Sequence, residues 1–119
     1  MTLSVRWALC ASLICVLPAA AQVKTDHLLG KYSTTDDGCR DAATQDFEIR
    51  RGIVEGPDIL CILGATQPTD KGTEAYEARC KEKGEMRLGT LAFDLSGKPE
   101  RIRIALPDRE EWITLYVCR

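Results

Sequence analysis

The sequence predicts an all-β fold: an antiparallel meander of about seven short strands that forms a small barrel or a two-layer sandwich, held by two disulfides. Apolar residues recur at every second position, and no stretch of about eleven or more residues keeps the i, i+3, i+4 spacing of an amphipathic helix. An even number of cysteines remains once the N-terminal segment is set aside, which is typical of small exported domains. The chain has 119 residues, enough for one compact domain.

The N-terminal segment, 1–21, has the pattern of a secretory signal peptide. Arg6 supplies the positive start, 7–17 is an apolar core, and small residues precede a cleavage site after Ala21. The apolar core is shorter than the roughly 20 residues that span a bilayer, so we expect no membrane anchor after cleavage. The mature protein is then a single β domain, 22–119, that is periplasmic or secreted.

The cysteines outside this segment are separated by 21, 18 and 37 residues. This spacing lacks the short C-x-x-C pairs of zinc sites and redox motifs, so we predict no metal and no redox centre. Three disulfide pairings are possible. We favour the nested one, because the register that places Cys61 opposite Cys80 also places Leu63 opposite Ala78 and keeps apolar residues on one face. The favoured disulfides are Cys61–Cys80 and Cys39–Cys118.

Alternation of apolar and polar residues indicates the first strands. A strand over 28–33 is followed by a polar loop, and a half-buried strand covers 46–50. A turn at Gly52 or at Gly56-Pro57 then leads into 59–63. This last run is apolar on both faces, so we expect a central strand.

In the middle of the chain, 76–80 has Tyr76, Ala78 and Cys80 on one face and charged residues on the other. Lys83-Gly84 is a tight hairpin signal. The next strand, 86–95, changes the phase of its apolar residues at Gly89, which predicts a β-bulge or a corner there.

A turn at 96–99 leads to 102–106, where apolar residues alternate with arginines. A register centred on this turn sets Phe93 opposite Ile102. The last strand, 112–118, has its apolar residues on one face and the aromatic and cysteine side chains on the other.

Composition and motifs exclude several classes of function. Lys and Arg number 16 against 18 Asp and Glu, and no basic run interleaves with aromatics, so we expect no nucleic-acid partner. No hydrolase, metalloprotease or phosphate-binding motif occurs, and no cofactor is predicted. The single histidine, His27, lies near the expected mature N-terminus, where chains commonly fray, so we assign no catalytic residue.

Two loops carry clusters of acidic residues that could form a site. Asp36, Asp37 and Asp41 lack the ligand order of calcium-binding loops and are interpreted as a solvated turn. An alternative function is a small hydrolase that uses carboxylates of 36–41 and 108–111. A structural component of the cell envelope is a further alternative.

Four residues near the C-terminus form a candidate binding surface. Arginines alternate along one strand and aromatic side chains along the next, and such mixed surfaces are favoured in protein interfaces. The residues are Arg101, Arg103, Trp112 and Tyr116.

Gly30-Lys31-Tyr32 at the start of the meander and Arg119 at its end resemble the lipocalin or calycin pattern. There a G-x-W motif on the first strand packs under a basic residue of the last strand and closes one barrel end; here Tyr32 stands in place of the tryptophan. The resemblance implies Tyr32 and Arg119 as a barrel-end pair. The layout is also similar to small uncharacterised periplasmic four-cysteine β-proteins of Gram-negative bacteria, which implies a location more than an activity.

These observations together favour an exported, non-enzymatic binding module. It would be an inhibitor of an envelope enzyme or a small calycin-like ligand binder, on a rigid disulfide-linked scaffold. The partner, an envelope protein or a small ligand, is not identified by the sequence.

Overall fold

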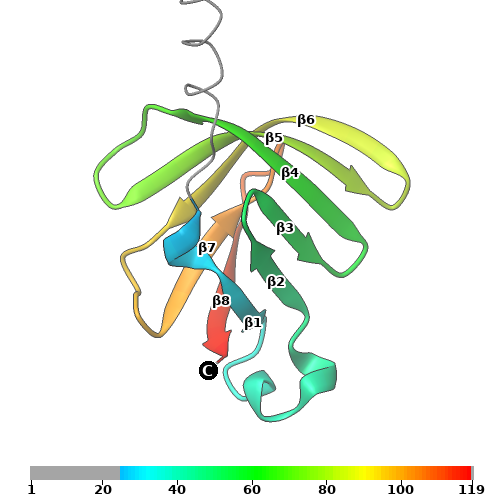
Figure 1. The fold of residues 1–119 in the computed structure, drawn as a ribbon, viewed down its shortest axis with the longest axis vertical. Coiled ribbons are helices and arrows are strands. Elements are labelled where there is room, and N and C mark those ends of the chain that lie inside the picture. The colour runs from blue at the N-terminus through cyan, green and yellow to red at the C-terminus, as the bar shows by residue number, and fades with distance from the viewer. Residues whose placement is uncertain (1–24, 119) are drawn as a thin grey trace, which may run out of the picture.

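A computed structural model describes residues 25–118, so the predicted signal peptide and Arg119 lie outside the described residues. Eight antiparallel strands follow one another in order, and the last pairs with the first to close a barrel (Figure 1). The fold is therefore all-β as predicted, and a barrel rather than a sandwich. The strands are β1 (Gly30–Ser33), β2 (Phe47–Arg50), β3 (Ile53–Gly56), β4 (Ile59–Gln67), β5 (Thr73–Glu82), β6 (Glu85–Asp94), β7 (Arg101–Ala105) and β8 (Trp112–Cys118).

Short 3-10 turns complete the described part of the chain. One precedes β1, and two lie in the loop between β1 and β2. They are η2 (Asp26–Leu28), η3 (Gly38–Arg40) and η4 (Ala42–Thr44).

The structure has eight strands rather than about seven, because the chain turns at both of the alternative positions that the sequence predicts. Gly52 adopts a left-handed conformation, with φ of 71°, between β2 and β3. Asp58 adopts a similar conformation, with φ of 59°, between β3 and β4. Asp tolerates this region better than most residues, so both tight turns are accessible to the sequence.

The barrel interior is filled by side chains from all eight strands. Val54, Leu91, Phe93, Ile104 and Leu115 expose none of their surface. Tyr76 and Phe93 make an edge-to-face contact with ring centroids 6.0 Å apart. Inward positions alternate with outward ones along each strand, as expected for a small barrel.

The expectation that 59–63 is buried on both faces is wrong for β4. The segment 59–63 has a strand on each side, but only its inward face is buried: Leu60 and Ile62 are 39% and 56% exposed on the outward face. A strand in a barrel has two neighbours but only one face toward the core.

No β-bulge lies at Gly89, because β5 and β6 keep one register from Thr73–Asp94 to Glu82–Glu85. The apolar residues before Gly89 simply face outward. A Cβ on Gly89 would lie only 2.9 Å from the Pro107 Cβ, so the glycine permits a close approach of the β7–β8 loop. The register shift of this sheet region lies in β4 instead, between Leu63 and Thr66.

The register of β6 with β7 also differs from the expectation. Phe93 lies opposite Ile104 rather than Ile102. The connection runs from 95 to 100, longer than the predicted turn, and the Arg101 amide donates to the Gly97 carbonyl within it. A shift of two residues keeps every side chain on its predicted face, so the alternation alone could not reveal it.

The nested disulfide pairing is confirmed. Cys61 and Cys80 lie opposite each other on β4 and β5 and are buried, and Leu63 lies opposite Ala78 as predicted. The second disulfide, Cys39–Cys118, joins η3 to the end of β8. Two disulfides are typical of a protein of an oxidising compartment.

Candidate functional site

The predicted binding surface lies on the outward face of β7 and β8. Arg101 pairs with Tyr116 across the two strands, and Ala105 pairs with Trp112. Inward residues of the same strands, such as Ile102 and Leu115, are buried in the core. The structure therefore places the four predicted residues on one face, which we call the β7–β8 face: Arg101, Arg103, Trp112 and Tyr116.

Arg103 is fixed on two sides. Its Cζ lies 5.3 Å from the centre of the Trp112 ring, a cation–π arrangement. Its Nε donates to Asp94 Oδ2 at 2.9 Å, and Nη2 donates to the same oxygen. The side chain is thus held by β6 and stacked on β8 before any partner arrives.

Asp94 was missed in the sequence analysis. Its Oδ1 accepts a hydrogen bond from the Ser96 amide at 3.0 Å. This backbone contact and the Arg103 guanidinium lower the pKa of Asp94 to about 2. Asp94 lies directly opposite Arg103, whereas the predicted register placed it opposite Arg101. The wrong register therefore concealed the ion pair.

A hollow of about 270 Å³ adjoins the β7–β8 face. Within residues 25–118, Arg101 makes no ion pair, unlike Arg103. A Cβ on Gly97 would lie 2.7 Å from the Arg101 Cγ, so the glycine gives the Arg101 stem its space. The hollow is lined by Asp94, Ser96, Gly97, Arg101, Ile102 and Arg103.

The barrel-end residue Tyr32 is buried, and its hydroxyl donates to the Leu28 carbonyl at 2.5 Å. Burial raises the pKa of the Tyr32 phenol. The hydrogen bond from Tyr32 to Leu28 thus links β1 to η2. Its pairing with Arg119 remains a prediction, because Arg119 lies outside the described residues.

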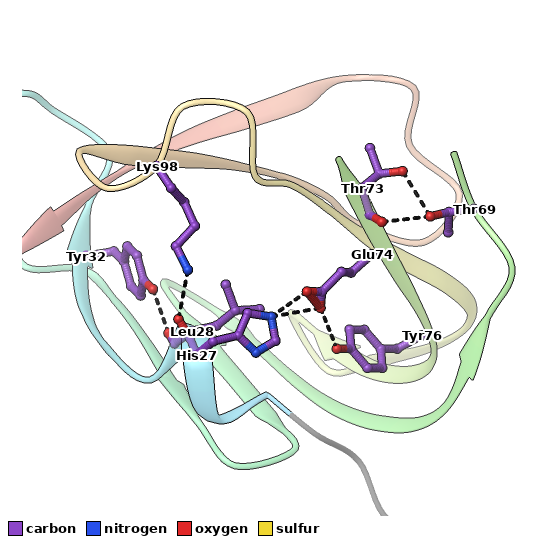
Figure 2. Close-up of polar contacts among 8 residues, drawn as sticks. All are labelled: His27, Leu28, Tyr32, Thr69, Thr73, Glu74, Tyr76 and Lys98. Carbon is purple, nitrogen blue, oxygen red and sulfur yellow. Dashed lines mark hydrogen bonds and ion pairs between the residues drawn. The ribbon is translucent and has the colours of Figure 1, made fainter. Parts of the chain in front are cut away.

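His27 is held in place rather than frayed (Figure 2). Its Nε2 contacts both oxygens of the Glu74 carboxylate, at 2.9 Å for Oε2, and must donate because a carboxylate only accepts. Tyr76 donates to the same carboxylate at 2.9 Å, and Lys98 Nζ donates to the His27 carbonyl at 3.1 Å. Burial and the Glu74 carboxylate raise the pKa of Tyr76 to about 12.

This contact set, which we call the His27–Glu74 clasp, joins η2 and the β6–β7 loop to the start of β5. Sequence reasoning missed it because His27 and Glu74 are 47 residues apart and share no local motif. The clasp therefore holds η2 and the β6–β7 loop at one end of the barrel.

The acidic loops have other roles. The Asp41 side chain accepts from the Ala43 amide at 3.0 Å and caps η4. In the described part of the chain, no group of three or more His, Cys, Asp or Glu side chains is placed to hold a metal. No hydrogen bond or ion pair among these residues joins 36–41 to 108–111.

The chain matches no protein-family model, no curated protein and no solved structure. Among residues 25–118, no helix is long and apolar enough to cross a membrane. The fold and the candidate site describe the protein as a small antiparallel β-barrel with two disulfides, a filled interior and a face of arginine and tryptophan side chains.

Proposed function

We propose that the protein is an exported, non-enzymatic binding module that recognises a partner protein through the β7–β8 face. A periplasmic location is supported by the signal-peptide pattern at 1–21 and by the two disulfides. Inhibition of an envelope enzyme is the form of binding that we favour.

The observation that carries this proposal is the fixed Arg103 beside Arg101, which makes no ion pair within 25–118. A side chain that is already ordered loses little entropy on binding. Arg101 offers a guanidinium to a partner carboxylate, and the exposed Trp112 edge offers apolar area next to it. Tryptophan and arginine are the residues most enriched at the energetic centres of interfaces.

The filled interior supports surface recognition over a calycin-like carrier. Large inward side chains, among them Tyr76, Phe93 and Leu91, are fully buried. A small barrel of eight strands has an interior just wide enough for side chains or for one small ligand. Side chains already take that space.

Affinity capture from an envelope extract tests the proposal. The oxidised protein should retain one protein in stoichiometric amount, and Arg101→Ala or Trp112→Ala should lose it. Lys31→Ala, an exposed change on β1, is the matched control and should retain it. Retention of nothing, or equal retention by all variants, would contradict recognition through this face. A small molecule bound in native mass spectrometry would favour the carrier instead.

A further inference from the structure

The outward face of β4, β5 and β6 carries most of the large exposed apolar side chains of the described residues. Leu60 and Ile62 lie on β4, and Met86 and Leu88 lie on β6, with exposures of 39% to 66%. These strands form the upper part of the barrel in Figure 1. Several large exposed apolar side chains on one face of a barrel, with polar residues among them, mark an interaction site.

β5 places a column of charges through the middle of this surface. Its outward residues are Glu77, Arg79 and Lys81, and all three are exposed. None of them forms an ion pair within residues 25–118, although Arg50 on nearby β2 pairs with both Glu48 and Glu55. We call these three charges and the four apolar side chains the β4–β6 face.

The face has one row of large side chains next to one row of small ones. At the level of Arg79, the strand partners are Ile62 on β4 and Leu88 on β6. At the level of Glu77, Thr90 is the partner on β6, and Gly64 approaches on β4, where its Cβ would lie 3.6 Å from the Glu77 Cβ. An open hollow of about 690 Å³ covers these two rows.

We propose that the β4–β6 face binds a second copy of this chain. The two-fold axis lies in the plane of the interface and is perpendicular to the three strands. It runs between the row of Glu77 and the row of Arg79. Rotation about this axis reverses the strand direction, so β5 lies antiparallel to β5 of the second copy. Glu77 of each copy then faces Arg79 of the other.

The same rotation matches the shapes of the two faces. Ile62 and Leu88 of one copy lie over Gly64 and Thr90 of the other, so the large row enters the hollow above the small row. Sheets that pack face to face interdigitate in this manner. A two-fold axis along the strands would instead place Arg79 against Arg79, and this repulsion excludes it. The β7–β8 face stays outside the contact, so the inference does not depend on the proposed function.

Sedimentation and light scattering on the exported, oxidised protein test the pairing. The wild-type protein should be a dimer, and Glu77→Arg or Arg79→Glu should each raise the dissociation constant by about tenfold or more. An equal mixture of the two variants should dimerise again as a heterodimer, because each variant supplies the charges that the other lacks. Glu110→Arg and Lys31→Glu are matched reversals at exposed positions elsewhere and should leave the dimer intact.

Three outcomes would overturn the inference. They are a wild-type monomer at about 100 µM, a dimer that neither reversal weakens, and a mixture that associates no better than either variant alone. Thermal unfolding and disulfide mapping of each variant show that it is folded, and recovery in the mixture separates a lost contact from a lost fold. A wild-type monomer that still captures its partner through Trp112 would overturn the dimer and leave the proposed function standing.

Discussion

The Asp94 carboxylate accepts hydrogen bonds from two directions, the Ser96 amide and the Arg103 guanidinium, and its pKa is about 2 in the folded protein. An ordinary aspartate has a pKa of 3.8. Because the folded-state pKa is the lower of the two, ionised Asp94 stabilises the fold above about pH 4. This contribution is lost as the pH falls toward 2.

Asp94→Asn should therefore flatten the acid side of the stability profile. The melting temperature of the wild-type protein should fall between pH 4 and 2 by more than that of the variant, because the variant has no carboxyl group to protonate there. Thermal unfolding at a series of pH values measures this. Asp36→Asn, at an exposed loop position, should keep the wild-type profile. Parallel profiles for wild type and Asp94→Asn would contradict the role of Asp94.

Tyr76→Phe tests the His27–Glu74 clasp at its buried end. The phenyl ring keeps the contact with Phe93 but loses the donor to Glu74, so the free energy of unfolding should fall by about 1 kcal/mol. The raised pKa adds a second readout. The stabilisation is present below pH 10 and is lost as the pH rises toward 12, so the ultraviolet titration of the wild-type protein should contain an ionisation near pH 12 that the titration of Tyr76→Phe lacks. The same high-pH ionisation in both proteins would contradict the clasp.

For individual residues, the sequence predicts which face of a strand a side chain occupies better than it predicts the hydrogen-bond or ion-pair partner of that side chain. Alternation correctly placed Arg103 and Trp112 outward and Tyr76 inward. The partners Asp94 and Glu74 were missed, because contacts across strands depend on register and contacts across the barrel depend on closure. Neither property has a local signal.

Turn length decides which elements could be placed in register. The two-residue turn at Lys83-Gly84, with φ of 49° and 85°, fixes the pairing of β5 and β6 and was predicted from the sequence. The longer connection between β6 and β7 admits several registers with the same inward face. A short turn therefore fixes the register of the two strands that it joins, whereas a long connection leaves several registers possible.

Gly89→Ala tests why a glycine occupies the middle of β6. The added methyl group would meet the rigid Pro107 ring, so the free energy of unfolding should fall by about 1 to 3 kcal/mol. Gly64→Ala is the control, since its nearest neighbour would be at an ordinary contact distance of 3.6 Å. Chemical denaturation of dilute protein compares the two. Equal losses would show that glycine flexibility, rather than the Pro107 contact, determines the effect.

For the molecule as a whole, barrel closure was the feature that the sequence left open. A sandwich and a barrel require the same alternation, and the difference lies in the pairing of β1 with β8, which joins Lys31 to Cys118. The disulfides were predictable because one of them connects adjacent strands with matching apolar faces. That local register then determined the second pair by elimination.

Removal of each disulfide should reveal unequal contributions. The loops that they close have sequence separations of 79 and 19 residues. Chain entropy predicts losses of about 4.5 kcal/mol for the double variant of Cys39 and Cys118 to alanine, and about 3.2 kcal/mol for that of Cys61 and Cys80. Denaturant unfolding of the two double variants measures both. A larger loss for Cys61 and Cys80 would show that core packing outweighs loop entropy.

The pairing of β1 with β8 brings the beginning of the barrel chain beside its end: Lys31 is the strand partner of Cys118. A short peptide could therefore join the two strands, and the chain could be opened elsewhere. The exposed connection between β4 and β5, at 68–72, is a suitable place for new termini because it lies outside both strands. The barrel should in this way tolerate circular permutation with both faces preserved.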